Sequence, residues 1–298
     1  MKTCCRSGSL GWRCLRGLIL SAAIWLLVLN APVRAQSVEF DDWAGFKPGS
    51  WCELRTTTRT MNEQGDVVSE SVSTARYQLA DFTGDVVKLN IAKGTVEYEG
   101  KEFPTPAATL IVRQYGQAQA DKIEIVEQPK EKLEVGIDKV ECRSVKALLS
   151  GSDGSREVVT LFRDAAITFP VRRVVRTFDA KGDSIDTTTT DAWAMNVPHR
   201  VGNELLPTTH YRTLYRNHKL SSTAVSIKSA EVPGQLVHST IAERDASDRL
   251  LRYTVQELVS YGGPDKPTRA TMISDRAKER REAREERHER REIRRGRR

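Results

Sequence analysis

The chain has 298 residues, with 47 Lys and Arg against 40 Asp and Glu, and a formal net charge of +7. The excess positive charge lies at the ends: residues 1–35 carry only basic charges, and residues 276–298 carry twelve basic and six acidic side chains. Residues 36–275 are mildly acidic, with 30 basic and 34 acidic side chains, which argues against a nucleic-acid-binding domain because that needs a basic face.

The first 35 residues have the features of a secretory signal peptide. Four basic residues precede an apolar run of thirteen residues, Gly17–Leu29. That run is short for a membrane-spanning helix, which needs about 20 apolar residues, and typical of a signal-peptide core. Val33 and Ala35 are small enough for signal peptidase. We predict cleavage near Ala35, a periplasmic or secreted location, and no transmembrane span in the mature chain. The alternative is an uncleaved N-terminal anchor.

Two cysteines remain after cleavage, Cys52 and Cys142. In an oxidising compartment they could form one disulfide that closes a loop of about 90 residues and contributes roughly 4 kcal/mol. Cys52 alternates with Glu53, and Cys142 lies between Glu141 and Arg143, so each thiol faces away from its charged neighbours. Two separate buried thiols are the alternative, and both interpretations stay open.

The chain from Trp51 to Tyr261 reads as strands almost throughout. Its segments are rich in Val, Thr, Ile and Tyr, and turn signals separate them at hairpin spacing. Asp153-Gly154 and Gly182-Asp183, for example, supply the positive φ angles of tight turns. A short helix is expected only around residues 40–46. We predict an all-β fold of roughly twelve antiparallel strands, in one curved or rolled sheet or in two stacked meander sheets.

The predicted layout has an N-terminal β meander at residues 37–130 and a C-terminal β region at residues 131–270. A soft boundary lies at EQPKEK, residues 127–132, where charge and a proline interrupt the strand pattern. Whether the chain forms one β domain or two is left open.

The C-terminal region shows a candidate internal repeat, residues 140–194 and 209–261. VECRSV aligns with THYRTL, and FPVRRVVRTF aligns with VPGQLVHST if one residue is skipped. Both units have the order strand, turn, strand, Pro, strand, turn, strand. Pro170 and Pro233 stand at the first position of a strand, where the missing donor costs little. Coincidence between two meanders is the alternative.

Four stretches, KPGSWCELR, LEVGIDKVECRSV, VPGQLVHSTIAERD and YTVQELVSYG, look like those of uncharacterised exported bacterial β proteins. That group is similar in outline to the lipoprotein-carrier half-barrels of the LolA and LolB type. The resemblance covers residues 43–262 and implies a curved antiparallel sheet with a concave apolar face that binds lipid or acyl chains. The chain departs from the carriers because it has no amphipathic helix to close that face.

No catalytic, cofactor-binding or metal-binding motif is present. The histidines lack metal spacing, although His210 and His218 could share one face of a long strand. The GSDGS stretch at residues 151–155 is a hairpin turn by context, since a nucleophile elbow needs a strand before it and a helix after it. We therefore expect no cofactor and no enzymatic activity.

The C-terminal tail, residues 271–298, is rich in Arg and Glu and has too few apolar residues to join a core. It can be a solvated helix or disordered. Because export would separate it from chromosomal DNA, we predict contacts with anionic lipid or polysaccharide and not with nucleic acid. The candidate contact residues are Arg280, Arg281, Arg284, Arg287, Arg290, Arg291, Arg294, Arg295, Arg297 and Arg298.

Two classes of function follow from these features. The first is a binding or carrier module of the cell envelope whose curved sheet holds an apolar or polymeric ligand. The second is a structural envelope protein tethered to anionic surfaces by its tail, and a secreted hydrolase is a further alternative. A deep apolar pocket would favour the carrier, an exposed apolar patch over a filled core the structural protein, and converging Asp, Glu or His the hydrolase.

Overall fold

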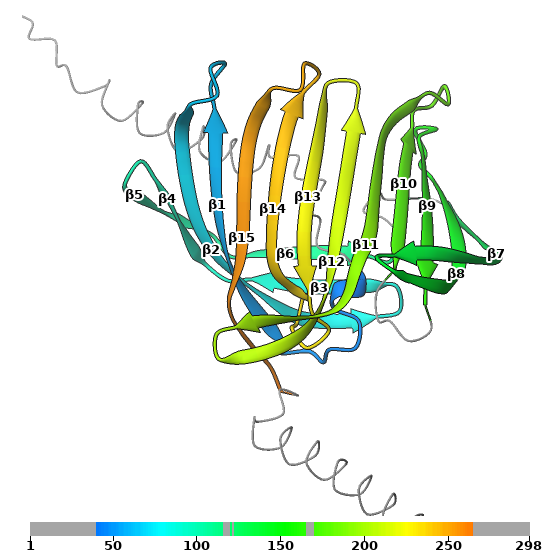
Figure 1. Cartoon of the computed structure of the whole chain (residues 1–298), viewed down its shortest axis with the longest axis horizontal. Coiled ribbons are helices and arrows are strands. Elements are labelled where there is room, and N and C mark those ends of the chain that lie inside the picture. The colour runs from blue at the N-terminus through cyan, green and yellow to red at the C-terminus, as the bar shows by residue number, and fades with distance from the viewer. Residues whose placement is uncertain (1–39, 116–119, 121, 165–169, 265–298) are drawn as a thin grey trace, which may run out of the picture. The chain divides into compact units, whose positions relative to one another are not determined.

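A computed structural model describes residues 40–115, 120, 122–164 and 170–264. Residues 1–35, the predicted signal peptide, and the arginines of the tail lie outside these ranges. The described part is antiparallel β almost throughout, and its strands belong to one curved sheet (Figure 1). The all-β prediction is confirmed. The described ranges contain no helix with the length and apolar character of a membrane span.

One short helix precedes the sheet, and fifteen strands make it. The helix expected around residues 40–46 is a single 3-10 turn followed by bends. The elements are η2 (Phe40–Asp42), β1 (Trp51–Met61), β2 (Val67–Thr83), β3 (Val86–Ile91), β4 (Gly94–Tyr98), β5 (Lys101–Thr105), β6 (Ala108–Arg113), β7 (Lys122–Val135), β8 (Asp138–Ser150), β9 (Arg156–Arg163), β10 (Arg172–Phe178), β11 (Ser184–Val201), β12 (Glu204–Asn217), β13 (Leu220–Lys228), β14 (Leu236–Asp245) and β15 (Leu250–Gly262).

The strand order joins the two halves of the chain. It runs β5-β4-β2-β1-β15-β14-β13-β12-β11-β10-β9-β8-β7, and β3 links β2 to β6. Because β1 pairs with both β2 and β15, the N-terminal and C-terminal strands are parts of the same sheet. Residues 127–132, where the sequence suggests a boundary, lie instead inside β7. A register shift between Gln128 and Glu131 marks the place, and an edge strand tolerates Pro129 because its free side needs no donor.

The sheet has more strands than expected because the segment after β2 changes partner. β3 pairs with the end of β2 from Tyr77 to Thr83, whereas β4 pairs with Ser71 to Thr74. The stretch VVKLNIAKGTVEY, which reads as one strand, is therefore divided between Ile91 and Gly94.

The two candidate repeat units coincide with two four-strand meanders, β8 to β11 and β12 to β15. Pro170 precedes β10 in the first meander, and Pro233 precedes β14 in the second. The meanders join through β11 and β12, which pair along their length with register shifts after Ala192 and Ala194.

The core consists of separate clusters. In the first, Phe40 and Trp43 pack against Cys52 on β1, Leu79 on β2 and residues of β3 and β6. In the second, Leu133, Val135 and Cys142 of the β7–β8 hairpin pack against Ala192 and Tyr211. The η2 segment therefore covers the N-terminal strands, and the tip of the hairpin covers β11 and β12.

Cys52 and Cys142 are both free and buried. They belong to these two different clusters, so the structure has two separate thiols and not the bridge that the sequence also allowed.

Candidate functional site

Alternation along the central strands defines two faces of the sheet. On β13, Ser222, Ala224 and Ser226 are buried, whereas Thr223 and Val225 are exposed. Residues opposite each other in an antiparallel ladder share a face, so the register extends this distinction from β2 to β11. We call the two sides the buried face and the exposed face.

One part of the buried face is polar. Three rows of opposed side chains cross it from β11 to β2, and only Ala192, Ala224 and Ile241 among them lack a polar group. The first row is Thr188, Tyr215, Ser222, Glu243, Arg252, Thr60 and Ser69; the second is Thr190, Thr213, Ala224, Ile241, Thr254, Thr58 and Ser71; the third is Ala192, Tyr211, Ser226, Ser239, Gln256, Thr56 and Ser73.

We call these three rows the hydroxyl face. The resemblance to lipoprotein carriers implies an apolar lining, and for this part of the sheet that expectation is wrong. The reason is the placement of serine and threonine: the register brings those of the three rows to the same side of the sheet, whereas others, such as Thr57 and Thr223, lie on the exposed face.

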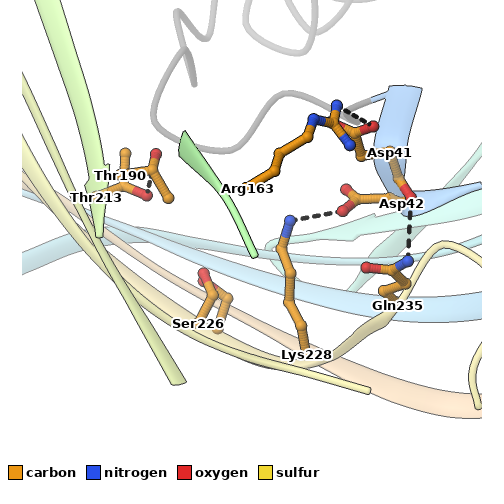
Figure 2. A network of polar contacts seen from close by, with 9 residues as sticks. Asp41, Asp42, Arg163, Thr190, Thr213, Ser226, Lys228 and Gln235 are labelled. Atoms are coloured by element: carbon orange, nitrogen blue, oxygen red, sulfur yellow. Dashed lines mark hydrogen bonds and ion pairs between the residues drawn. The ribbon is translucent and has the colours of Figure 1, made fainter. Parts of the chain in front are cut away.

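Neighbouring hydroxyl groups on this face bond to one another. The hydroxyl oxygens of Thr190 and Thr213 are 3.0 Å apart (Figure 2). Those of Thr58 and Thr254 are 3.3 Å apart. Ser226 and Ser239, both buried, are also joined at 3.0 Å. The bonds satisfy polar groups that would otherwise cost free energy when buried.

Ser222 differs from these hydroxyl groups. Its Oγ is buried and has no hydrogen-bond partner in the structure. Leaving a buried hydroxyl without a partner costs about 1–3 kcal/mol, so Ser222 lowers the stability of the chain alone.

Accessibility increases from the centre of the hydroxyl face toward β1 and β2. Ser222, Ser226 and Ser239 in the centre are buried, whereas Thr58 on β1 and Ser71 on β2 are half-buried. The part of these rows on β1 and β2 is therefore more open to a ligand than their centre.

One charged pair lies within the first row. Glu243 is buried, and its Oε2 is 3.6 Å from Nη1 of Arg252. Burial raises the pKa of the Glu243 carboxyl, and the Arg252 guanidinium offsets part of that rise. This pair can offer a ligand both an acceptor and a cationic donor.

A second set of charges fixes η2 to the strands (Figure 2). Arg163 of β9 donates to both carboxylate oxygens of Asp41 at 2.7 Å, and Lys228 of β13 donates to Asp42 at 2.6 Å. The Gln235 side chain donates to the backbone oxygen of Asp41 at 3.0 Å. Because each carboxylate has a cationic partner, we interpret this network as one that holds η2 in place and not as a ligand site.

Beyond β11 the first row of this face becomes apolar, whereas Arg173, Thr177 and Glu157 lie on the same face beside it. The first row continues from Thr188 through Val175, Val159 and Ala147 to Ile125 on β7. Ala147 and Val159 form a buried cluster with Leu149 and Leu161. We call this part the apolar zone.

Three grooves among the described residues have volumes of about 420, 360 and 500 Å³. Each is lined in part by charged side chains, such as Arg76, Asp153 and Lys146. None of these three is the deep apolar pocket that would favour a carrier of acyl chains.

His210 and His218 do not share a strand face. β12 ends at Asn217, so His218 lies beyond the strand that carries His210. The ring of His210 meets Trp193 edge-on at 5.3 Å, and burial together with His199 lowers its pKa. Within the described ranges, no three His, Cys, Asp or Glu side chains are grouped as metal ligands.

The hydroxyl face could not be found by motif searching. Its signals in the sequence are the alternating serines of SESVS, residues 69–73, and the threonine runs at residues 56–58 and 187–190. Each of these is an ordinary strand-forming pattern.

No protein-family model matches the chain, and no curated protein matches it either. Among solved structures, it is similar to a putative outer membrane lipoprotein-sorting protein domain from Vibrio parahaemolyticus, at 12% identity over 75% of this chain and 88% of that chain, with a TM-score of 0.32. It is also similar to kievitone hydratase from Nectria haematococca, at 8% identity over 71% of this chain and 89% of that chain, with a TM-score of 0.22. The first likeness is a weak similarity of fold, and both scores are too low to support an argument about function.

Proposed function

We propose that this protein is a non-enzymatic, extracytoplasmic binding module whose hydroxyl face holds a polar, polymeric ligand, such as a segment of a glycan. The observation that carries the proposal is the composition of the three rows, in which only Ala192, Ala224 and Ile241 lack a polar group.

Glycan chemistry suits this lining. Serine and threonine hydroxyl groups both donate and accept hydrogen bonds, as sugar hydroxyl groups do. In the first row, the unpartnered Oγ of Ser222 and the charged Glu243–Arg252 pair would form stronger hydrogen bonds with a ligand than the other hydroxyl groups. An acyl chain would leave these groups buried without partners, which costs free energy. Of the apolar and polymeric ligands expected for a carrier, the polymeric one is therefore favoured.

The extracytoplasmic location in this proposal rests on residues 1–35, with their basic start, their apolar core and the small residues Val33 and Ala35 at their end. The tail arginines, Arg280 to Arg298, would add contacts with anionic lipid or polysaccharide. Both statements concern segments outside the described residues.

A substitution pair on β1 tests the proposal. Thr58→Val removes a hydroxyl of the second row and keeps the shape of the side chain. We expect it to weaken binding of soluble peptidoglycan or lipopolysaccharide oligosaccharides about five- to tenfold, as the loss of one hydrogen bond does. Titration calorimetry measures the effect.

Thr57→Val is the matched control, because Thr57 belongs to the exposed face of the same strand. We expect this variant to bind as the wild type does. Equal binding by wild type and Thr58→Val would contradict the proposal, and so would binding to phospholipid vesicles with no binding to the oligosaccharides.

A further inference from the structure

The ends of the strand order differ in how well they are protected. β5 has five residues, and Lys101, Glu102 and Pro104 are among them. Short length, charge and proline are devices that stop a sheet edge from pairing with another chain. β7 has fourteen residues and, among the described strands, pairs only with β8.

The first seven residues of β7, Lys122 to Gln128, form an edge that no other described strand pairs with, called here the open edge. They contain no proline, and their apolar side chains are uncovered: Ile123 is 41% exposed, Ile125 52% and Val126 43%. Pro129 and the register shift after Gln128 end this regular part. Such an edge presents unpaired backbone donors and acceptors to any strand that can match it.

We propose that this edge pairs with the same edge of a second copy, antiparallel, about a two-fold axis at Ile125. Ile125 is the middle residue of the seven, so this register pairs the whole open edge with itself. It places Ile125 opposite Ile125, Ile123 opposite Glu127, and Glu124 opposite Val126.

The neighbouring symmetric registers are less favourable. An axis at Glu124 sets two glutamates directly opposite each other, and like charges in that position destabilise a strand pair. An axis at Val126 leaves Lys122 and Ile123 outside the paired segment. The register centred on Ile125 separates the glutamates and keeps both isoleucines inside.

The pairing also continues the apolar zone. Ile123 and Ile125 lie opposite Leu149 and Ala147 on β8, so they are on its side of the sheet. A two-fold axis perpendicular to the sheet puts the apolar zones of both copies on the same side. Because each copy uses the same patch, the assembly stops at two copies.

Sedimentation velocity of the full exported chain at micromolar concentration tests the pairing. We expect a dimer for the wild type and a monomer for Ile125→Lys, because two lysines would face each other at the axis. Like charges so placed raise the dissociation constant about 100-fold or more. The variant should remain folded, since the Ile125 side chain is half exposed.

Ile111→Lys is the control, because Ile111 is an equally exposed isoleucine on β6, another terminal strand. We expect this variant to remain dimeric. A second measurement uses Ile125→Cys, which should form a covalent dimer under mild oxidation, whereas Ile111→Cys should not. A monomeric wild type, a dimer that survives Ile125→Lys, or assemblies that grow beyond two copies would overturn the proposal.

Discussion

Ser222, Glu243 and Arg252 lie side by side in the first row of the hydroxyl face, on β13, β14 and β15. Ser222 has no hydrogen-bond partner, and burial raises the pKa of Glu243. Without a ligand, these residues lower the stability of the folded chain. Residues of this kind are common in binding sites.

The pH dependence of stability reports on Glu243. Its pKa is raised in the folded protein from an ordinary value of 4.5, so the folded state binds more protons between that value and the higher folded pKa. The contribution of Glu243 to stability is therefore lost as pH rises through this range. We expect Glu243→Gln to gain stability relative to the wild type as pH rises from about 4 to about 8, measured by urea unfolding. A difference that does not change with pH would contradict this account.

Thiol reactivity tests the placement of the cysteines. Burial raises the pKa of Cys52 to about 12, with Asp42 adding to the effect, and burial also raises the pKa of Cys142. The thiolate is the reactive form, so the native protein should resist iodoacetamide at about pH 8. In denaturant without reductant, mass spectrometry should find both thiols alkylated. Alkylation only after reduction would show a bridge instead.

At the scale of elements, the loop between β13 and β14 holds η2 in place. Gln235 bonds to the backbone of Asp41, which is 194 residues away in the chain. Gly234 has a φ of +73°, and a Cβ at this position would lie 2.9 Å from the Trp43 ring and 3.1 Å from Cys52 Sγ. The close approach of this loop to Trp43 therefore requires glycine.

We expect Gly234→Ala to lower the free energy of unfolding by about 2–4 kcal/mol, because a left-handed backbone and a steric clash both act against it. Gly202→Ala isolates the backbone cost, since its φ is +56° and no atom lies within 4 Å of the added Cβ. That control should lose about 1 kcal/mol. Chemical denaturation measures the free energy of unfolding of both variants. Equal losses would mean that Gly234 does not approach Trp43 closely.

Local features of the elements could be predicted from the sequence. Strand alternation and turn residues indicate the two meanders, with Pro170 and Pro233 before their third strands. Long-range features could not, because they depend on which strands pair. The place of β1 between β2 and β15 is one case, and it is this pairing that puts Thr58 beside Ser71 and Thr254. Without the register, nothing in the sequence brings those three residues together.

At the scale of the whole described sheet, the two faces and the open edge have different roles. The hydroxyl face spans β2 to β11, the apolar zone follows it toward β7, and the edge of β7 ends the strand order. A ligand on the hydroxyl face and a second copy at β7 would occupy separate surfaces, so ligand affinity should not depend on dimer formation.

The most direct test of the central claim is to identify what the native protein carries. The protein would be isolated from cells that make it, and its bound molecules analysed by native mass spectrometry and sugar analysis, beside Thr58→Val and Thr57→Val. We predict a sugar-containing oligomer on wild type and Thr57→Val and less of it on Thr58→Val. Bound phospholipid or fatty acid in its place, or equal amounts of sugar on all three, would contradict the account.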